Sequence, residues 1–322
     1  MFKKAFISAA LGLCFVGISQ AQDLTLYTSQ PVADAQMTVE AFEKANPGVK
    51  VEWVRDGTTK LMTKFRAELA AGAVKPDLLL IADSVTLEQL KKEDLLLPYD
   101  SPEKTNYDPS LYDAEGYYYG TKLITTGIAY HSEAPNKPTS WADLLETEYQ
   151  DLAAMPSPLY SGAALIHLST ITTNDDFGWK YYEDLKANGM TPQQGNGSVL
   201  TAIASGAKPY GVLVDYMAIR EKAKGSPVEF VFPTEGVSMV TEPVAILKDA
   251  KNKELAQKFV DFVLSDAGQK LVVEQGYLPA RNGVASPEGF PSRDQIKLLA
   301  FDAAKSLDNA ESDKEKFADI FE

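Results

Sequence analysis

Hydroxyl-bearing and glycine residues recur at places where a predicted strand ends and a predicted helix begins. Free backbone N–H groups and the helix macrodipole make such places suitable for holding an anion. Serine, threonine and asparagine are also ordinary helix caps, so capping alone explains any single one of them. Their recurrence in both halves of the chain predicts that several line one anion-binding crevice. The segments are Thr28-Ser29, Gly57-Thr58-Thr59, Asp83-Ser84, Ser161-Gly162-Ala163 and Asn196-Gly197-Ser198.

Strands and helices alternate through the first third of the chain, in an order that brings these strand ends together. Residues 24–27 and 49–54 are predicted strands, and residues 31–46 form a predicted helix with a proline in its first turn. The continuous apolar run at 77–82 is typical of a parallel strand that is covered on both faces. This alternation predicts a doubly wound α/β sheet.

The second half of the chain repeats the α/β pattern. Residues 210–215 and 228–232 are predicted strands, and helices are predicted to begin at Ser161 and Asn196. Residues 252–264 form a predicted amphipathic helix. A chain of 322 residues also exceeds the roughly 250–300 that a single core supports. The sequence therefore predicts two domains.

The first residues of the chain have the features of a cleavable export signal. Lys3 and Lys4 precede an apolar stretch at 5–16, and small residues at positions 19 and 21 predict cleavage after Ala21. One alternative is an uncleaved membrane anchor, but the apolar stretch is short and the cleavage site is good. The other is lipidation at Cys14, but a bulky leucine precedes this cysteine where a small residue is usual. Cleavage removes the only cysteine of the chain, which excludes disulfides, thiolate metal sites and a cysteine nucleophile from the mature protein. The predicted location is the periplasm.

The chain is acidic, with 31 Lys and Arg against 45 Asp and Glu and a formal net charge of −14. Loss of a leader that carries two lysines and no acid takes the charge to −16. Such a protein is not expected to bind nucleic acid or an anionic membrane. No later stretch approaches the roughly 18 apolar residues of a membrane span, so no membrane insertion is expected after cleavage. Backbone N–H groups can still bind an anionic ligand within a negative protein.

Five stretches carry a resemblance to a known family, and each of them alone is a weak signal. On their combination the mature chain resembles the periplasmic solute-binding proteins of ABC importers, close to their ferric-iron-binding branch. The resemblance implies a two-lobed α/β fold, with a mixed sheet and flanking helices in each lobe and the ligand in the cleft between them. It also implies a monomer that delivers a small solute to a membrane permease, without enzymatic activity or a cofactor. The stretches are 26–29 (Leu-Tyr-Thr-Ser), 75–79 (Lys-Pro-Asp-Leu-Leu), 160–163 (Tyr-Ser-Gly-Ala), 211–216 (Gly-Val-Leu-Val-Asp-Tyr) and 252–268.

The resemblance also implies where the lobes divide. Lobe 1 is expected to comprise residues 22–124 and 244–285, and lobe 2 residues 125–243 and 286–322. The crossover strands that join the lobes are expected near 123–129 and 241–246.

The ferric-iron site of the resembling branch does not carry over to this chain. Pro31 stands where those proteins place a histidine, and Thr59 occupies the region of their glutamate. Tyr216 is followed by Met217, where the iron binders have a second tyrosine. Because Fe³⁺ favours several anionic oxygen ligands, one tyrosine makes a poor site. No metal is therefore expected.

The anion half of that family site does carry over. Ser161-Gly162-Ala163 matches the helix start that holds the anion accompanying iron in the resembling proteins, and Asn196-Gly197 resembles a loop beside it. We therefore expect a small organic phosphate or phosphonate. Asp83, Asp215 and Glu242 are expected at its other end, where carboxylates suit an ammonium group or sugar hydroxyls. A 2-aminoethylphosphonate-like solute and a sugar phosphate both meet this description.

Two alternatives stay open, a ferric-iron carrier and an exported phosphate-ester hydrolase. Carboxylate pairs could serve acid–base catalysis, but the chain has neither a G-x-S-x-G elbow nor an H-E-x-x-H motif. The candidate ligand-binding residues are Thr28, Ser29, Thr58, Thr59, Asp83, Ser84, Ser161, Gly162, Ala163, Asn196, Gly197, Asp215, Tyr216 and Glu242.

Overall fold

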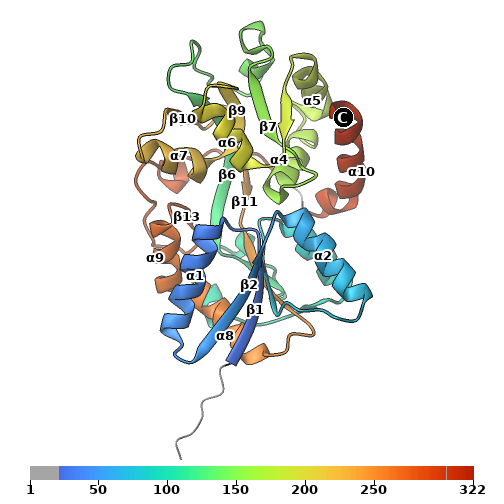
Figure 1. Ribbon diagram of the computed structural model, residues 1–322, viewed down its shortest axis with the longest axis vertical. Coiled ribbons are helices and arrows are strands. Elements are labelled where there is room, and N and C mark those ends of the chain that lie inside the picture. Colours follow the sequence, from blue (N-terminus) through green and yellow to red (C-terminus); the bar gives the residue numbers. More distant parts are fainter. Residues whose placement is uncertain (1–21, 302) are drawn as a thin grey trace, which may run out of the picture.

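The computed structural model describes residues 22–301 and 303–322, which form two lobes, one above the other in Figure 1. The predicted export signal at 1–21, including Cys14, lies outside the described residues. Within the two described ranges, no helix combines the length and the apolar character needed to cross a membrane.

The lower lobe in Figure 1 is built on a six-stranded mixed sheet. Strand β1 (Gln22–Thr28) runs parallel to β2 (Val49–Arg55) on one side and to β3 (Leu78–Leu80) on the other. Strand β12 (Pro243–Leu247) comes from far along the chain and lies antiparallel to β3. The remaining elements of this lobe are β4 (Leu96–Leu97), β5 (Tyr118–Gly120), α1 (Val32–Ala45), α2 (Thr58–Ala70), α3 (Ser84–Lys92), α8 (Lys253–Leu264) and α9 (Asp266–Glu274).

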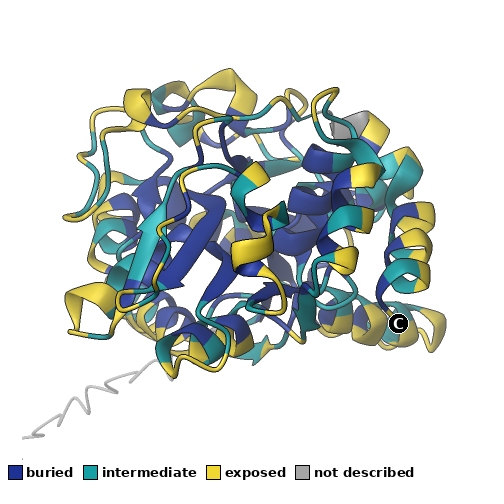
Figure 2. Cartoon of the chain, turned by 90° about the horizontal axis from the view of Figure 1, so that it is seen from above, coloured by how far each residue is buried: buried dark blue, intermediate teal, exposed yellow. Residues whose placement is uncertain are grey.

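Helices cover both faces of this sheet, which explains the continuous apolar run around β3. Leu78 and Leu80 belong to the core formed with α1 and α8, whereas Leu79 faces the core formed with α2 and α3. Phe42 of α1 meets Phe259 of α8 edge to face, with ring centroids 4.9 Å apart. Figure 2 shows buried residues along the sheets and exposed residues on the outer helices. Val32, at the start of α1, is an exception among large apolar residues, with 62% of its surface exposed.

The upper lobe in Figure 1 is built on a seven-stranded mixed sheet. Its long strand β6 (Lys122–His131) lies antiparallel to β9 (Tyr210–Val214), and β7 (Ala153–Pro156) lies parallel to β9. With helices around both sheets, the two-lobed mixed α/β fold expected from the sequence is confirmed. The remaining elements are β8 (Thr191–Gln193), β10 (Val228–Val231), β11 (Ser238–Val240), β13 (Leu278–Pro279), α4 (Gly162–Thr172), α5 (Gly178–Ala187), α6 (Asn196–Ala204), α7 (Asp215–Ala223) and α10 (Ala303–Phe321).

Two connections between the lobes run side by side and are joined by hydrogen bonds. One leads from β5 into β6, and the other leads from β11 into β12. The backbone N–H groups of Thr121 and Lys122 both donate to the carbonyl of Thr241, at 3.1 and 3.2 Å. Glu242 follows with φ of 40°, a left-handed conformation that is uncommon for a residue with a side chain. A strained, buried residue therefore lies where the chain passes between the lobes.

His167 lies in the core of the upper lobe, where its ring centroid is 4.9 Å from that of Trp141 in a tilted arrangement and its Nδ1 is 2.9 Å from the hydroxyl of Ser238. Burial lowers the pKa of this histidine to about 3. The unfolded chain, with a histidine pKa of about 6.5, therefore binds a proton between pH 3 and 6.5 that the folded chain does not. The stability contributed by neutral His167 is complete above that window and is lost as the pH falls through it.

We expect His167→Gln to flatten the fall in unfolding free energy between pH 6 and 4, by up to about 1.4 kcal/mol per pH unit. Urea unfolding followed by tryptophan fluorescence measures this slope. Between pH 7 and 8 the two proteins should change in parallel, which serves as the internal control. Equal slopes for both proteins at acid pH would show that the buried, neutral His167 does not cause this loss of stability.

Candidate functional site

A cavity of about 240 Å³ lies between the two lobes. The lower lobe contributes Ser29 and Thr58 to its wall, and the upper lobe contributes Ser161 and Asn196. Its volume is below the roughly 300–1,000 Å³ of a drug-sized pocket, so it suits a small solute. A larger hollow of about 910 Å³ lies beside the edge strand β2, on one lobe alone. The inter-lobe cavity is the better candidate because it joins residues from both lobes.

Five helices begin at the wall of this cavity. Their N-cap residues, one each from α1, α2, α4, α6 and α7, all line it. Each helix N-terminus is equivalent to about half a positive charge. The cavity is therefore favourable for an anion even though the whole chain carries a charge of −14. The five caps are Pro31, Gly57, Ser161, Gly195 and Val214.

Several of these helix starts keep their first N–H groups available. Gly57 and Gly195 have no side chain that could cap α2 and α6. Ser161 caps α4 by accepting a hydrogen bond from the N–H of Ala164 at 3.3 Å. Within the described parts of the chain, no acceptor is found for the N–H groups of Gly162 and Ala163. These two groups can bind an anion at the start of α4.

Two side chains fix the loops around the cavity. The amide of Asn196 donates to Ser161 Oγ at 3.3 Å and accepts from the N–H of Val214 at 3.3 Å, so it ties the starts of α4, α6 and α7 together. On the lower lobe, Ser29 Oγ accepts from the N–H of Ala82 at 2.9 Å and joins the ends of β1 and β3. These polar residues therefore position the helix starts as well as lining the cavity.

Most of the candidate residues predicted from the sequence meet at this cavity. They come from strand ends that are far apart in the chain and belong to both lobes. Their contact with a ligand remains a prediction. The residues that line the cavity are Ser29, Thr58, Ser161, Gly162, Ala163, Asn196, Gly197, Tyr216 and Glu242.

The other candidates do not line the cavity, and two of them serve their own loops. The hydroxyl of Thr28 accepts from the N–H of Gln30 at 3.1 Å and is fully buried. Asp83, rather than Ser84, is the N-cap of α3 and accepts from the N–H of Thr86 at 3.1 Å; burial raises its pKa. Thr59 is the second residue of α2 and lies away from the wall.

Asp215 also turns away from the cavity, which corrects the expectation that it binds the far end of a ligand. Its Oδ2 accepts from the N–H and the hydroxyl of Thr125 on β6, at 3.0 and 2.7 Å. Its Oδ1 accepts from the N–H of Tyr216 at 2.6 Å. Burial raises the pKa of Asp215 to about 7, against the opposing effect of these hydrogen bonds. This carboxyl group holds the end of β9 against β6.

Tyr160 is a cavity residue that the sequence reasoning missed. Its ring rests on two glycines: a Cβ built at Gly57, on the lower lobe, would lie 2.6 Å from the ring, and one at Gly195 would lie 3.0 Å from it. Its hydroxyl donates to Asp56 Oδ1 at 3.2 Å, across the gap between the lobes. The signals were its position just before Ser161 and the glycine at the N-cap of α2. Tyr160 thus covers the cavity and links the lobes.

Gly162 marks a very close approach of the lobes. A Cβ at this position would lie 2.7 Å from the carbonyl oxygen of Ala82, 2.8 Å from Asp83 Cβ and 2.9 Å from Thr58 Oγ1. All three atoms belong to the lower lobe, whereas Gly162 is the first residue of α4 in the upper lobe. Only glycine allows the start of α4 to lie this close to the opposite lobe.

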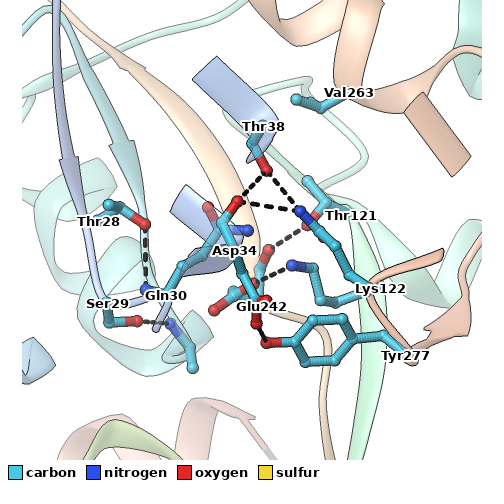
Figure 3. A network of polar contacts seen from close by, with 12 residues as sticks. Thr28, Ser29, Gln30, Asp34, Thr38, Thr121, Lys122, Glu242, Val263 and Tyr277 are labelled. Carbon is cyan, nitrogen blue, oxygen red and sulfur yellow. Dashed lines mark hydrogen bonds and ion pairs between the residues drawn. The ribbon is translucent and has the colours of Figure 1, made fainter. Parts of the chain in front are cut away.

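A buried network of charged groups adjoins the cavity at Glu242 (Figure 3). Lys122 Nζ is 2.7 Å from Glu242 Oε2, and the two side chains are 1% and 3% exposed. Burial raises the pKa of Glu242, while the charge of Lys122 opposes this shift. Asp34, at the start of α1, accepts two 2.9 Å hydrogen bonds from Arg220 of α7 and one from the hydroxyl of Tyr277. Ion pairs therefore join the lobes next to their crossover strands.

The described residues contain no group of three or more His, Cys, Asp or Glu side chains that could hold a metal ion. His167 is enclosed in the upper lobe, and His131 lies at the far end of β6. Neither histidine lines the cavity. The cavity thus offers helix N-termini and hydroxyl groups rather than a set of metal ligands.

Comparisons with known proteins give a family match and several relatives. The model of the family described as "Bacterial extracellular solute-binding protein" matches residues 73–307. An uncharacterized protein of Haemophilus influenzae is 27% identical over 326 residues, covering 92% of this chain and 89% of that protein. Iron uptake protein A1 of Synechocystis is 23% identical, covering 85% and 81%. The spermidine/putrescine-binding periplasmic protein of Salmonella typhimurium is 26% identical, covering 65% and 66%.

Among solved structures, the periplasmic binding protein AfuA from Actinobacillus pleuropneumoniae, with fructose-6-phosphate bound, superposes with a TM-score of 0.86. The two proteins are 22% identical, and the alignment covers 93% of this chain and 98% of AfuA. At this identity the likeness concerns the fold. The named ligands of these similar proteins are iron, polyamines and a sugar phosphate.

Proposed function

The chain belongs to the bacterial extracellular solute-binding proteins, and we propose that it is the binding protein of an ABC importer, of the ferric-binding-like branch, and captures a small organic phosphate or phosphonate. The exported protein would bind this solute in the inter-lobe cavity and present it to a membrane permease. Residues 1–21 would act as its export signal, with cleavage after Ala21 and release of a monomer into the periplasm. The protein would act by binding, without turnover.

The observation that carries this proposal is the convergence of five helix N-termini on one small cavity. Backbone N–H groups and helix dipoles bind phosphate without a bulky cation. The N–H groups of Gly162 and Ala163 and the hydroxyls of Ser161 and Thr58 are the groups we assign to the anion. Ser29 and Asn196 would hold these groups in position, as their hydrogen bonds suggest.

The ligands of the similar proteins fit this cavity unequally. A ferric ion would need anionic side-chain ligands, and the described residues contain no suitable cluster. A polyamine would need carboxylates in a cavity whose wall is made of helix N-termini. A phosphate group matches the helix starts and hydroxyls. The charge of the wall therefore favours an organic phosphate or phosphonate.

Thermal unfolding with added solutes tests the proposal. We expect glucose 6-phosphate, glycerol 3-phosphate or 2-aminoethylphosphonate to raise Tm in a concentration-dependent way, because a ligand that binds only the folded state stabilises it. Spermidine and ferric citrate, at equal concentrations, should leave Tm unchanged. A rise with spermidine alone, or a tyrosinate-to-iron absorption band with ferric citrate, would overturn the proposal in favour of the corresponding cation.

A further inference from the structure

The acidic and basic side chains around the cavity determine the rest of the ligand, which we call its body, that can be attached to the phosphate or phosphonate, which we call its anionic head. Among the described residues that line the cavity, Glu242 is the only acid and Arg55 the only cation. Arg55 is exposed, and its Nε donates to the carbonyl of Gln30 at 2.7 Å. The question is whether Glu242 is available to a positively charged ligand group.

Glu242 already has a counter-ion. Lys122 Nζ lies 2.7 Å away, and both side chains are almost completely buried. The opposite charges of the two side chains cancel, so the buried pair is neutral as a unit. Apart from this ion pair, neither Lys122 Nζ nor Glu242 Oε2 has a hydrogen-bond partner among the described residues. Glu242 Oε2 thus has an unused acceptor position, while the negative charge of its carboxylate is balanced by Lys122.

Every other acid near the cavity is engaged elsewhere. Asp34 is held by Arg220 and Tyr277, and Asp215 by Thr125. Asp83 caps α3. Asp56 accepts from Tyr160 and from its neighbouring backbone N–H, and it lies 3.7 Å from Lys60 Nζ. No unpaired carboxylate therefore faces the cavity from the described parts of either lobe.

From this distribution of charge we infer that the solute combines its anionic head with an uncharged, hydroxyl-bearing body, as in a phosphorylated polyol. This inference rests on the proposed function, since it takes the phosphate or phosphonate head as given. The head lies at the start of α4, and a hydroxyl of the body donates to Glu242. An ammonium group on the body would meet the Lys122–Glu242 pair and five helix N-termini without a free counter-ion. Of the two solute types that the sequence left open, a sugar phosphate is thus favoured over a 2-aminoethylphosphonate-like solute.

A pair of matched probes tests it by isothermal titration calorimetry. 2-Hydroxyethyl phosphate and 2-aminoethyl phosphate have the same number of heavy atoms and the same phosphate, and they differ in a hydroxyl against an ammonium group. We expect the purified exported protein to bind the hydroxyl compound at least tenfold more tightly. Equal or tighter binding of the amine would overturn the inference.

A variant links this preference to the ion pair. Lys122→Gln leaves the carboxylate of Glu242 without its counter-ion, so the ratio of the two affinities should move at least tenfold toward the amine. Lys224→Gln, the same change at the exposed residue that follows α7, is the control and should leave the ratio unchanged. An unchanged ratio in a folded Lys122→Gln protein would overturn the role of the pair. If Lys122→Gln does not fold, the wild-type comparison decides the inference by itself.

The experiment separates this inference from the proposed function. If neither probe nor inorganic phosphate binds, the anion site is wrong and the proposed function fails with it. If inorganic phosphate binds but neither probe does, or if both probes bind equally, the anion site stands. The inference of an uncharged, hydroxyl-bearing body is then wrong.

Discussion

Replacing Ser161 by aspartate should weaken the binding of glucose 6-phosphate by about 100- to 1,000-fold. Aspartate is as good an N-cap as serine, so α4 should still form and the protein should fold. Its carboxylate, however, would lie where we place the phosphate. Two like charges about 4 Å apart repel by about 4 kcal/mol at the effective dielectric near a protein surface. Each 1.4 kcal/mol costs about tenfold in affinity.

The control for this variant is Ser161→Asn. Asparagine has nearly the same size as aspartate and also caps helices, but it carries no charge. Calorimetry on both variants isolates the charge from the change of shape. Asparagine should cost less than about tenfold in affinity. If the aspartate variant bound within threefold of the asparagine variant, no anion would lie at the start of α4.

Replacing Gly162 by alanine should weaken the same ligand by about 10- to 100-fold for a different reason. The added Cβ would lie 2.7 Å from the carbonyl oxygen of Ala82, a backbone atom of the opposite lobe that cannot rotate away. The lobes would have to stay further apart, so the cavity could not close around its ligand. Alanine favours helix formation more than glycine does, so Tm without ligand should not fall. Small-angle scattering should give a larger radius of gyration for the liganded variant than for the liganded wild type.

Gly72→Ala is the matched control, because a Cβ there meets no atom within 4 Å. Its positive φ of 61° makes the change destabilising without affecting the lobes. It should bind like the wild type. A Gly162→Ala protein with wild-type affinity and radius of gyration would show that the lobes do not need this close approach.

The local features of the site could be predicted from the sequence because they depend on neighbouring residues. Ser161 as a helix cap and the buried strand around Leu79 follow from short patterns of hydroxyl and apolar residues. The same patterns placed Asn196 at the start of α6. Such positions need only local propensity and the period of a strand or helix.

The direction of the acidic side chains could not be predicted in the same way. Asp215 follows a strand, as a ligand-binding residue does, but its partner Thr125 is 90 residues away on β6. Glu242 pairs with Lys122 across the two connections between the lobes, 120 residues apart in the chain. Tyr160 was missed because its role depends on glycines that reach it from two other loops. A single sequence does not reveal which strand lies beside which.

The single cysteine of the chain is at position 14, so removal of the first 21 residues leaves a protein without a thiol. Val32 is 62% exposed and directly follows Pro31, which lines the cavity. A cysteine introduced at Val32 would therefore be the only site that a thiol-reactive fluorophore could label, one residue from the cavity wall. The labelled protein would work as an optical sensor, whose emission changes when the lobes close on their solute. Stopped-flow measurements on it would give the association and dissociation rates without any reporter on the solute.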